Sequence, residues 1–418
     1  MKKVIICLFC TMFLGSAIFA QEIQTQTEML RNNALKVFID CSSCDMDYIK
    51  REIPFINYVR DRKEAQVHLM VTTRETGSGG KEYKIDFIGL NDFEGDNETV
   101  IYNSGPNDTS DEIRAGRTHN LKMGLIKYVI KTPLNNFITI DYDLAQEEEE
   151  KIVEDKWKSW VFEIDIQGDF QGEETQENIE FDAGFSAEKV TPEWRIEFDG
   201  EFDMEIESFK TEEDEPNYES NSTNFEHYLI KSLSDHWSAG EHIILKSSTY
   251  RNNKFSYSFF PAIEYNIFPY KESSRKQLRF NYGLGYEFVN YRDTTIYGKM
   301  QEGQFKQMFV VALGLKQPWG TVSSSIRASS YLYDLSKNNF EFTTTLRWRI
   351  YKGLSFTISG GYSIIHDQLS IPRKDATQAE ILLSLREMES QYNYECEIGL
   401  SYTFGAIYNN VVNPRFGK

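Results

Sequence analysis

The sequence predicts an all-β transmembrane barrel of about 12 antiparallel strands, preceded by a small periplasmic α/β domain. The first observation is the strict alternation of apolar and polar residues in long segments such as Phe340–Ile350 and Tyr392–Phe404. A strand points successive side chains to opposite faces. Segments of about 9–11 residues with this period are typical of strands that cross a membrane with one face toward lipid and the other toward the lumen.

Twelve alternating segments follow Trp157, and an even number places both ends of a barrel on one side of the membrane. The alternation is weakest in the fourth segment, around His227–Ile230. The predicted strands are Lys158–Phe170, Asn178–Glu188, Trp194–Phe209, Asn221–Leu233, His236–Tyr250, Lys254–Phe268, Gln277–Tyr291, Phe305–Gln317, Thr321–Asp334, Asn339–Tyr351, Leu354–Asp367 and Gln391–Phe404.

The second observation is the alternation of short and long connections, which is expected of periplasmic turns and outer loops. The short connections are Lys189–Glu193, Ser234–Asp235, Pro318–Gly320 and Lys352–Gly353. The long connections are Thr211–Ser220, Arg292–Gln304 and Gln368–Ser390. Two connections depart from this rule, since Arg251–Asn253 is short for an outer loop and Pro269–Lys276 is long for a periplasmic turn.

The third observation is the position of the tryptophans, which all fall near the predicted periplasmic ends of strands. Tryptophan is enriched at membrane–water interfaces, where its ring is buried and its N–H is hydrated. We therefore predict a periplasmic aromatic girdle formed by Trp157, Trp160, Trp194, Trp237, Trp319 and Trp348.

Bulk composition limits the function without deciding the fold. The 418 residues carry a formal net charge of −19, which argues against a nucleic-acid partner because such a partner calls for a basic face. The mean hydropathy of −0.50 fits a soluble all-β protein as well as a barrel with a polar lumen. The 24 Tyr, 29 Phe and 6 Trp favour the barrel, whose interfaces are rich in aromatic residues.

The chain begins with a predicted signal peptide at residues 1–20. Lys2 and Lys3 form its basic start, and Val4–Leu14 forms its apolar segment. Cys7 and Cys10 lie inside this segment, so we expect both to be removed with it.

Residues 21–132 predict the periplasmic α/β domain. Its strands are expected at Leu35–Ile39, Gln66–Thr73, Glu82–Ile88 and Thr99–Tyr102. Asp45 can cap a helix that carries Ile49, Ile53, Ile56 and Val59, which Pro54 should kink or split. Thr109 and Glu112 form a capping box for a second helix, Asp111–Lys131.

An acidic linker is predicted at residues 133–156, with the charge run Glu147–Glu150, and a periplasmic tail is predicted at residues 405–418.

The motif Cys41-Ser42-Ser43-Cys44 lies between the first predicted strand and the first predicted helix. A CxxC pair there could be a redox pair, because a helix N-terminus lowers the pKa of the attacking thiol. The flanking Trp and Pro of thioredoxin-like enzymes are absent, and an exported compartment oxidises paired thiols. A structural disulfide between Cys41 and Cys44 is therefore favoured. Cys396 falls on the predicted lipid face, where a thiol behaves as a small hydrophobe.

Two resemblances accompany these patterns. The strand Ala65–Thr73, a Gly turn, a second strand and a helix with Arg114, Arg117 and His119 resemble the amino-terminal α/β domain of TolB and curli-assembly proteins. The stretch Tyr265–Ser274, followed by Tyr282–Tyr286, resembles the salt-induced outer-membrane protein family. The whole layout, with the tail Tyr408–Phe416, resembles a group of outer-membrane β-barrel proteins from Bacteroidota and related phyla. The resemblance implies an outer-membrane location and no catalytic residue.

Two charged walls are predicted on the lumen face of the barrel. The acidic wall is Glu163, Asp165, Asp182, Glu197, Asp199, Glu201 and Asp203. The basic wall is Lys246, Arg279, Lys306, Arg327, Arg347 and Arg349. The two walls lie on opposite sides of a barrel of this size, which leaves two alternatives: a narrow aqueous channel with a transverse field, or a closed interior in which ion pairs bridge the walls.

Other chemistry is weakly supported. The carboxylates of Glu201, Asp203, Glu205 and Glu207 could attract divalent cations, but no loop has the spacing of a calcium motif, and we expect no metal site and no cofactor. A lipid-modifying enzyme would need a Ser–His pair, and the predicted barrel has few histidines that could form one. These are His227, His236, His242 and His366, with Ser234 and Ser238 beside His236.

The sequence thus favours a non-enzymatic outer-membrane protein in contact with outer-membrane lipid. The favoured function is a narrow passive channel, whose periplasmic domain either plugs the mouth or binds a periplasmic protein partner through residues 21–132. The alternatives are a non-conducting membrane anchor that acts through this domain and a membrane-embedded lipid-modifying enzyme.

Overall fold

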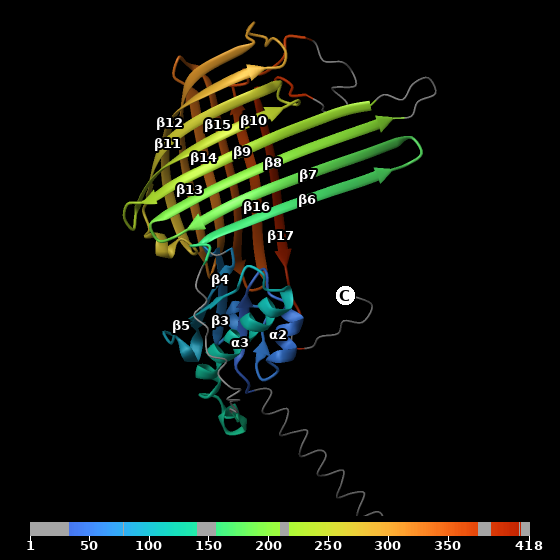
Figure 1. Ribbon diagram of the computed structural model, residues 1–418. Helices are drawn as coiled ribbons and strands as arrows, with labels where there is room; N and C mark the ends of the chain where they lie inside the picture. Colours follow the sequence, from blue (N-terminus) through green and yellow to red (C-terminus); the bar gives the residue numbers. More distant parts are fainter. Residues whose placement is uncertain are drawn as a thin grey trace, which may run out of the picture.

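The computed structural model describes residues 33–77, 79–139, 156–209, 217–374, 386–408 and 410. The predicted signal peptide, most of the acidic linker with its charge run Glu147–Glu150, and most of the tail lie outside these residues. The described chain forms a five-stranded sheet with helices and a separate twelve-stranded antiparallel sheet. Figure 1 shows the N-terminal domain, which contains the five-stranded sheet and the helices, below one end of the large sheet.

The N-terminal domain is a mixed sheet in the order β2-β1-β3-β4-β5, in which β1 pairs in parallel with β2 and β3. Its strands are β1 (Lys36–Asp40), β2 (Asn57–Tyr58), β3 (Val67–Glu75), β4 (Lys81–Gly89) and β5 (Glu98–Asn103). Its helices are α2 (Met46–Glu52) and α3 (Ser110–Val129), with short 3-10 turns η1 (Arg62–Glu64), η2 (Asn91–Phe93) and η3 (Pro133–Phe137).

Both helices of the domain begin at the predicted caps. The Asp45 side chain accepts a hydrogen bond from the Tyr48 N–H, and Thr109 and Glu112 form the complete capping box of α3. The prediction that the first helix continues to Val59 is wrong, because α2 ends at Glu52. Pro54 lacks an N–H and disfavours helical backbone at the preceding residue.

The helices cover one face of the five-stranded sheet and form the core of the domain. Fully buried side chains from the strands, among them Leu69 and Phe87, pack against Leu121, Leu125 and Tyr128 of α3. The Tyr128 hydroxyl donates a hydrogen bond to the Asp96 carbonyl at 2.8 Å, so the buried phenol is satisfied. Among the described residues, no helix is long and apolar enough to span a membrane.

The large sheet contains the twelve predicted strands in sequence order, which confirms the predicted fold class. Each strand pairs antiparallel with its neighbour in the chain. Most strands begin or end a few residues away from the predicted boundaries. The strands are β6 (Trp160–Gly172), β7 (Gln176–Val190), β8 (Trp194–Phe209), β9 (Asn217–Ser232), β10 (Trp237–Ser248), β11 (Asn253–Asn266), β12 (Lys276–Tyr291), β13 (Gln301–Gln317), β14 (Gly320–Tyr331), β15 (Asp334–Tyr351), β16 (Leu354–Ile365) and β17 (Tyr392–Tyr402).

The sheet is curled, and its two end strands are β6 and β17. Figure 1 shows β6–β8 passing in front of β16 and β17. Within the described residues the hydrogen-bonded order runs from β17 to β6 and the two end strands do not pair with each other. Both strands are accordingly the most exposed of the sheet on both faces.

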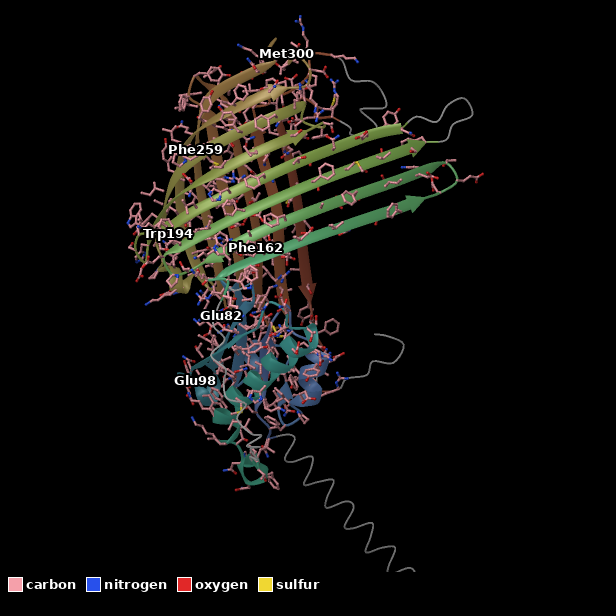
Figure 2. All side chains as sticks on the ribbon, in the orientation of Figure 1. Glu82, Glu98, Phe162, Trp194, Phe259 and Met300 are labelled. Atoms are coloured by element: carbon pink, nitrogen blue, oxygen red, sulfur yellow. A yellow bond between two sulfur atoms is a disulfide. The ribbon has the colours of Figure 1, made fainter. Side chains whose placement is uncertain are left out.

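One face of the large sheet is mostly apolar, and large apolar side chains are exposed on it from β6 to β17. The pairing register aligns Ile164 with Phe185, and Phe309 with both Tyr282 and Ala328, so most large apolar side chains of the sheet share this face. Ile164 is 73% exposed and Leu400 is 70% exposed. Buried residues such as Ser258 and Tyr331 lie on the other face, which is therefore the concave one. Figure 2 shows the side chains on the ribbon, with Phe162, Trp194 and Phe259 labelled on this sheet.

The six tryptophans lie at the end of the large sheet that meets the domain. Trp160, Trp194 and Trp237 begin β6, β8 and β10, and Trp319 lies in the turn before β14. Trp348 is near the end of β15, and Trp157 precedes β6 and is 68% exposed. The strand connections at this end include the short segments 191–193, 318–319 and 352–353.

Candidate functional site: a charged concave face and its junction with the domain

The concave face of the large sheet carries both predicted charged walls. In the acidic part, the register aligns Glu163 with Ser186 and Asp199 across β6, β7 and β8. It also aligns Asp182 with Asp203, and Glu197 with Glu188. The Asp165 carboxylate lies against Gly184, where an added Cβ would meet it at 2.3 Å. Glu201 is paired with the same glycine from the other side.

The basic wall occupies the same face on β10–β15, and most of its members contact acids close to them. Lys246 lies 3.3 Å from Glu226, and Arg279 lies 3.6 Å from Glu264. Lys306 lies 3.2 Å from Asp367.

Arg327 and Arg347 of the basic wall form no ion pair with any described residue, and no described ion pair joins the acidic wall to the basic wall. In the part of the chain that the structure describes, the charges of the two walls are therefore not neutralised by each other.

Arg349 lies on the same face as the rest of the basic wall and also contacts the domain. It lies two residues before the end of β15 at Tyr351, so its side chain can reach beyond the end of the strand. Both terminal nitrogens donate to Asp40 at the end of β1, each at 2.8 Å. The guanidinium also lies 5.3 Å from the centre of the Phe38 ring. The sequence alone assigned Arg349 to the lumen because its period matches that of Arg347.

We call the contacts between the domain and the tryptophan-rich end of the large sheet the junction, and this end the near end. The contacts are distributed around much of the near end. Arg275, before β12, lies 3.4 Å from Asp86 of β4, and Lys316 of β13 donates to the Val71 carbonyl at 2.7 Å. Lys352 contacts Glu64, and the Gly353 N–H donates to Asp61.

The β3–β4 hairpin reaches the opposite side of the same end. An added Cβ on Gly77 would lie 2.3 Å from the Val190 carbonyl oxygen at the end of β7, and one on Gly79 would lie 3.0 Å from Val161 of β6. The domain therefore spans the end of the large sheet from β6 and β7 to β15 and covers it.

The junction explains the buried polar residues of the domain. Side chains that alternate with the core along β1, β3 and β4 point away from the helices and toward the large sheet. His68 and Met70 are fully buried, and Asp86 is 6% exposed. These residues were not singled out from the sequence, although the polar residues Asp40, His68 and Asp86 inside apolar strands were an available signal.

Asp40 and His68 are electrostatically linked at the centre of the junction. Burial alone would raise the pKa of Asp40, but contacts with His68 and Arg349 outweigh burial and hold this pKa well below its ordinary value of 3.8. Burial is the main cause of a lowered pKa of His68. The His68 Nε2 atom lies 3.6 Å from Asp40, too far for a hydrogen bond. Asp40 is therefore charged and His68 neutral at neutral pH.

The chain after β17 returns to the domain and lies along its edge strand. Tyr408 forms an isolated antiparallel bridge with Val59, and the Arg60 N–H donates to the Ile407 carbonyl at 3.3 Å. Asn410 accepts from the Tyr58 N–H at 2.7 Å. The segment after β17 therefore also joins the domain to the large sheet.

Cys41 and Cys44 are joined by a disulfide between β1 and α2. Both cysteines pack against the domain core. Arg117 donates to the Ser43 hydroxyl within the same loop, and Arg114 lies 3.0 Å from the cap residue Asp45. This loop connects Asp40 of the junction to α2, which fits a structural bond. Cys396 is a free, exposed thiol on the apolar face of β17.

Three connections contact one another at the far end of the large sheet. The Ile296 N–H donates to the Ile371 carbonyl at 2.9 Å, and Thr295 forms a bridge with Pro372. Asn252 donates to the Ser370 carbonyl at 2.8 Å. Because Asp367 reaches Lys306 on the concave face, the connection after β16 bends inward at this end.

The barrel histidines contact groups other than serine hydroxyls. His242 lies 2.9 Å from Glu226, and the Nδ1 atoms of His227 and His236 contact the carbonyls of Glu197 and Asn266. Ser238 donates to the Tyr270 hydroxyl. Within the described residues, no ring nitrogen of these histidines contacts a serine, and no three His, Cys, Asp or Glu side chains are grouped to hold a metal.

Comparison with known proteins gives distant likenesses of fold among solved structures. No family model matches the chain, and no curated protein matches it. Among solved structures, the chain is similar to one described as "NanC porin structure in rhombohedral crystal form". The two are 13% identical with a TM-score of 0.27, and the match covers 58% of this chain and 100% of the other. At these values the likeness carries no inference about function.

Proposed function

We propose that this protein is an outer-membrane β-barrel that acts as a narrow passive channel, with its periplasmic mouth covered by the N-terminal domain. The observation that carries this proposal is the division of the large sheet into an exposed apolar face and a concave charged face. An exposed apolar band of this extent is unstable in water and stable against lipid. The signal peptide and the tryptophans at one end favour the same location.

The unbridged walls favour a conducting interior over a closed one. Lys246, Arg279 and Lys306 each pair with an acid near them rather than with the acidic wall. Two separated surfaces of opposite charge would orient polar solutes and favour one sign of ion. Closure of the barrel by pairing of β6 with β17 in the membrane is part of this proposal.

The test is ion selectivity of the full-length protein in planar bilayers. Changing Arg327 and Arg347 to Glu removes the two members of the basic wall that have no ion pair in the described chain. We expect conducting steps whose preference shifts toward cations in this variant. The matched control changes the exposed Arg251, at the far end, to Glu and should leave selectivity nearly unchanged. Conduction with identical selectivity in all three proteins would contradict a channel lined by these residues.

The second candidate is a non-conducting membrane anchor, favoured by the coverage of both ends of the large sheet. The domain covers the near end through the junction, and the inward-bent connection at Asp367 covers part of the far end. Absence of conductance from folded, membrane-inserted protein, including variants with a weakened junction, would favour this candidate. Its function would then lie in the domain and a periplasmic protein partner.

A further inference from the structure

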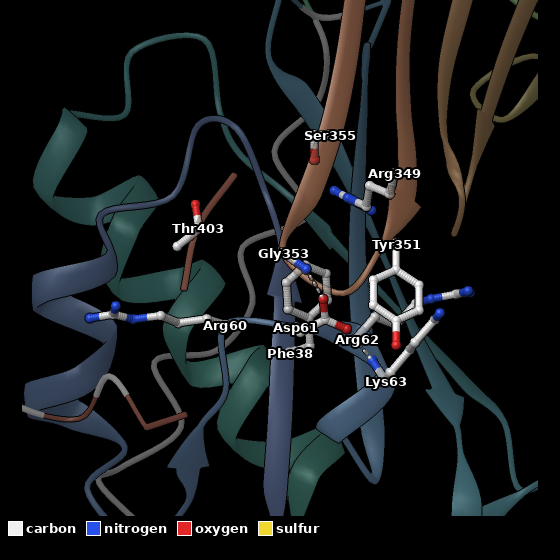
Figure 3. Close-up of a pocket in the computed structure, with 10 residues that line it drawn as sticks. All are labelled: Phe38, Arg60, Asp61, Arg62, Lys63, Arg349, Tyr351, Gly353, Ser355 and Thr403. Carbon is white, nitrogen blue, oxygen red and sulfur yellow. Dashed lines mark hydrogen bonds between the residues drawn. The ribbon is translucent and has the colours of Figure 1, made fainter. Parts of the chain in front are cut away.

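A cavity of about 140 Å³ lies where the domain meets the large sheet. Figure 3 shows that its walls come from both parts of the chain, with η1 and its preceding residues on one side and the turn after β15 on the other. The lining residues are Phe38, Arg60, Asp61, Arg62, Lys63, Arg349, Tyr351, Gly353, Ser355 and Thr403. The cavity therefore exists only when the domain is seated on the sheet.

The lining of this cavity is cationic in a chain whose net charge is −19. Arg60, Arg62 and Lys63 occupy three of four consecutive positions, and none has a carboxylate within ion-pair distance among the described residues. Asp61, the one lining carboxylate, accepts hydrogen bonds from the backbone N–H groups of Lys63 and Gly353. The acid is thus used for the junction, and the three cations keep their charge unpaired.

The sheet side of the cavity supplies polar groups from the concave face. Ser355 is paired with Arg349 across β15 and β16, on the face that carries the charged walls. The hydroxyls of Ser355 and Thr403 belong to the lining and can donate to an anion. Lys63 lies 4.4 Å from the centre of the Tyr351 ring, which holds its ammonium group beside the cavity.

We propose that this cavity binds a phosphate-bearing anion and that binding stabilises the seated domain. Guanidinium, ammonium and hydroxyl groups are the donors that phosphate oxygens prefer, and charge-assisted hydrogen bonds are the strong ones. Because each half of the cavity belongs to a different part of the chain, an anion bound there bridges the two parts. The phosphate could belong to a free solute or to a lipid headgroup, and the experiment separates these sources.

The experiment titrates the full-length protein in detergent with inorganic phosphate by calorimetry, against sodium chloride of equal ionic strength. The test variant is R62Q/K63Q, and the matched control is R51Q/K81Q, which removes two exposed cations of the same domain outside the cavity. We expect saturable phosphate binding to wild type and control, and affinity lower by at least about tenfold in the test variant. Ser355→Ala, on the sheet side, should weaken binding less while leaving the domain folded.

A second titration uses micelles that contain dihexanoyl phosphatidylglycerol. Binding of this lipid but not of inorganic phosphate, with the same loss in R62Q/K63Q, would assign the site to a headgroup. Binding of both would assign it to phosphate in general. Absence of saturable binding to either probe, or equal affinity in R62Q/K63Q and R51Q/K81Q, would overturn the proposal.

Discussion

The two sheets of this protein alternate apolar and polar residues in the same way and bury opposite faces. In the five-stranded sheet the apolar face is the interior, and Leu69 and Phe87 are fully buried under the helices. In the twelve-stranded sheet the apolar face is the exterior, and Ile164 and Leu400 are about three-quarters and two-thirds exposed. The same local pattern therefore specifies strands in both, and the surroundings of each sheet decide which face is covered.

The two sheets differ in what covers the apolar face. Burial of apolar surface contributes about 25 cal/mol per Å² only when something apolar covers it. In the domain, α2 and α3 supply this cover within the chain. In the large sheet no described helix covers the apolar face, and the proposed function assigns its cover to lipid. The following predictions test this contrast, beginning with the largest expected effect.

Phe87→Ala should destabilise the domain by about 3–5 kcal/mol, because the ring is fully buried. Phe87 packs directly on α3, where an added Cβ on Gly124 would meet its ring at 2.1 Å. Thermal unfolding of the domain in the full-length protein, monitored by near-ultraviolet circular dichroism, measures the change. Phe137→Ala, at a 60% exposed position, is the control and should change stability by less than about 1 kcal/mol. Equal losses in both variants would refute a core centred on Phe87.

Phe309→Lys should oppose membrane insertion by about 2–4 kcal/mol, because Phe309 is on the apolar face near the middle of β13. Met308→Lys adds the same charge one residue away on the concave face and should cost far less. The measurement is the free energy of unfolding from phospholipid vesicles in guanidinium chloride. If the two variants were equally destabilised, the assignment of lipid to one face would be wrong.

Arg349→Gln should weaken the junction by about 1–3 kcal/mol, because it removes a partly exposed two-point contact with Asp40. We expect faster hydrogen exchange in β1 and β3 of the domain. Their side chains that face the large sheet become accessible to water when the domain separates from it. Arg251→Gln removes an exposed arginine at the far end and is the control. Unchanged exchange in the Arg349 variant would mean that other contacts alone hold the domain.

Acid should weaken the domain in two separate ranges of pH. The pKa of His68 is lowered by burial, so its contribution to stability is complete above its ordinary value of 6.5 and is lost as pH falls below that value. Asp40 has a lowered pKa, so its contribution is complete above 3.8 and is lost below it. In the first range, the free energy of unfolding should change by at most about 1.4 kcal/mol per pH unit.

The pH profile of domain unfolding in wild type and His68→Phe measures this effect. The slope between pH 6.5 and pH 5 should be smaller in the variant, because the buried imidazole is absent. Identical slopes would show that His68 does not titrate on unfolding.

The contrast between the sheets also explains what the sequence could predict. The twelve long strands were predictable because the two-residue period extends over whole strands such as β8, Trp194–Phe209. The position where α2 ends was not predicted, because Ile56 and Val59 fit helical spacing. In the structure these two residues instead flank the short strand β2. The contact of Arg349 with Asp40 was not predicted, because sequence period gives the face of a strand and not what lies beyond its end.

The junction itself was not predictable from local pattern. Its contacts join residues far apart in the sequence, up to the 309 positions between Asp40 and Arg349, and depend on how the domain sits on the sheet. Only the polar residues inside the apolar strands β1, β3 and β4 indicated that the second face of that sheet is covered.

The most direct test of the account is the conductance of full-length protein in planar bilayers with and without an intact junction. Asp40→Asn weakens the junction, and Asp47→Asn, at an exposed position on α2, is the matched control. The account predicts low conductance for wild type and control and larger, sustained steps for Asp40→Asn, because the domain no longer covers the mouth. Equal, large conductance in all three would show that the domain does not cover a pore. Absence of conductance in all three would contradict a channel.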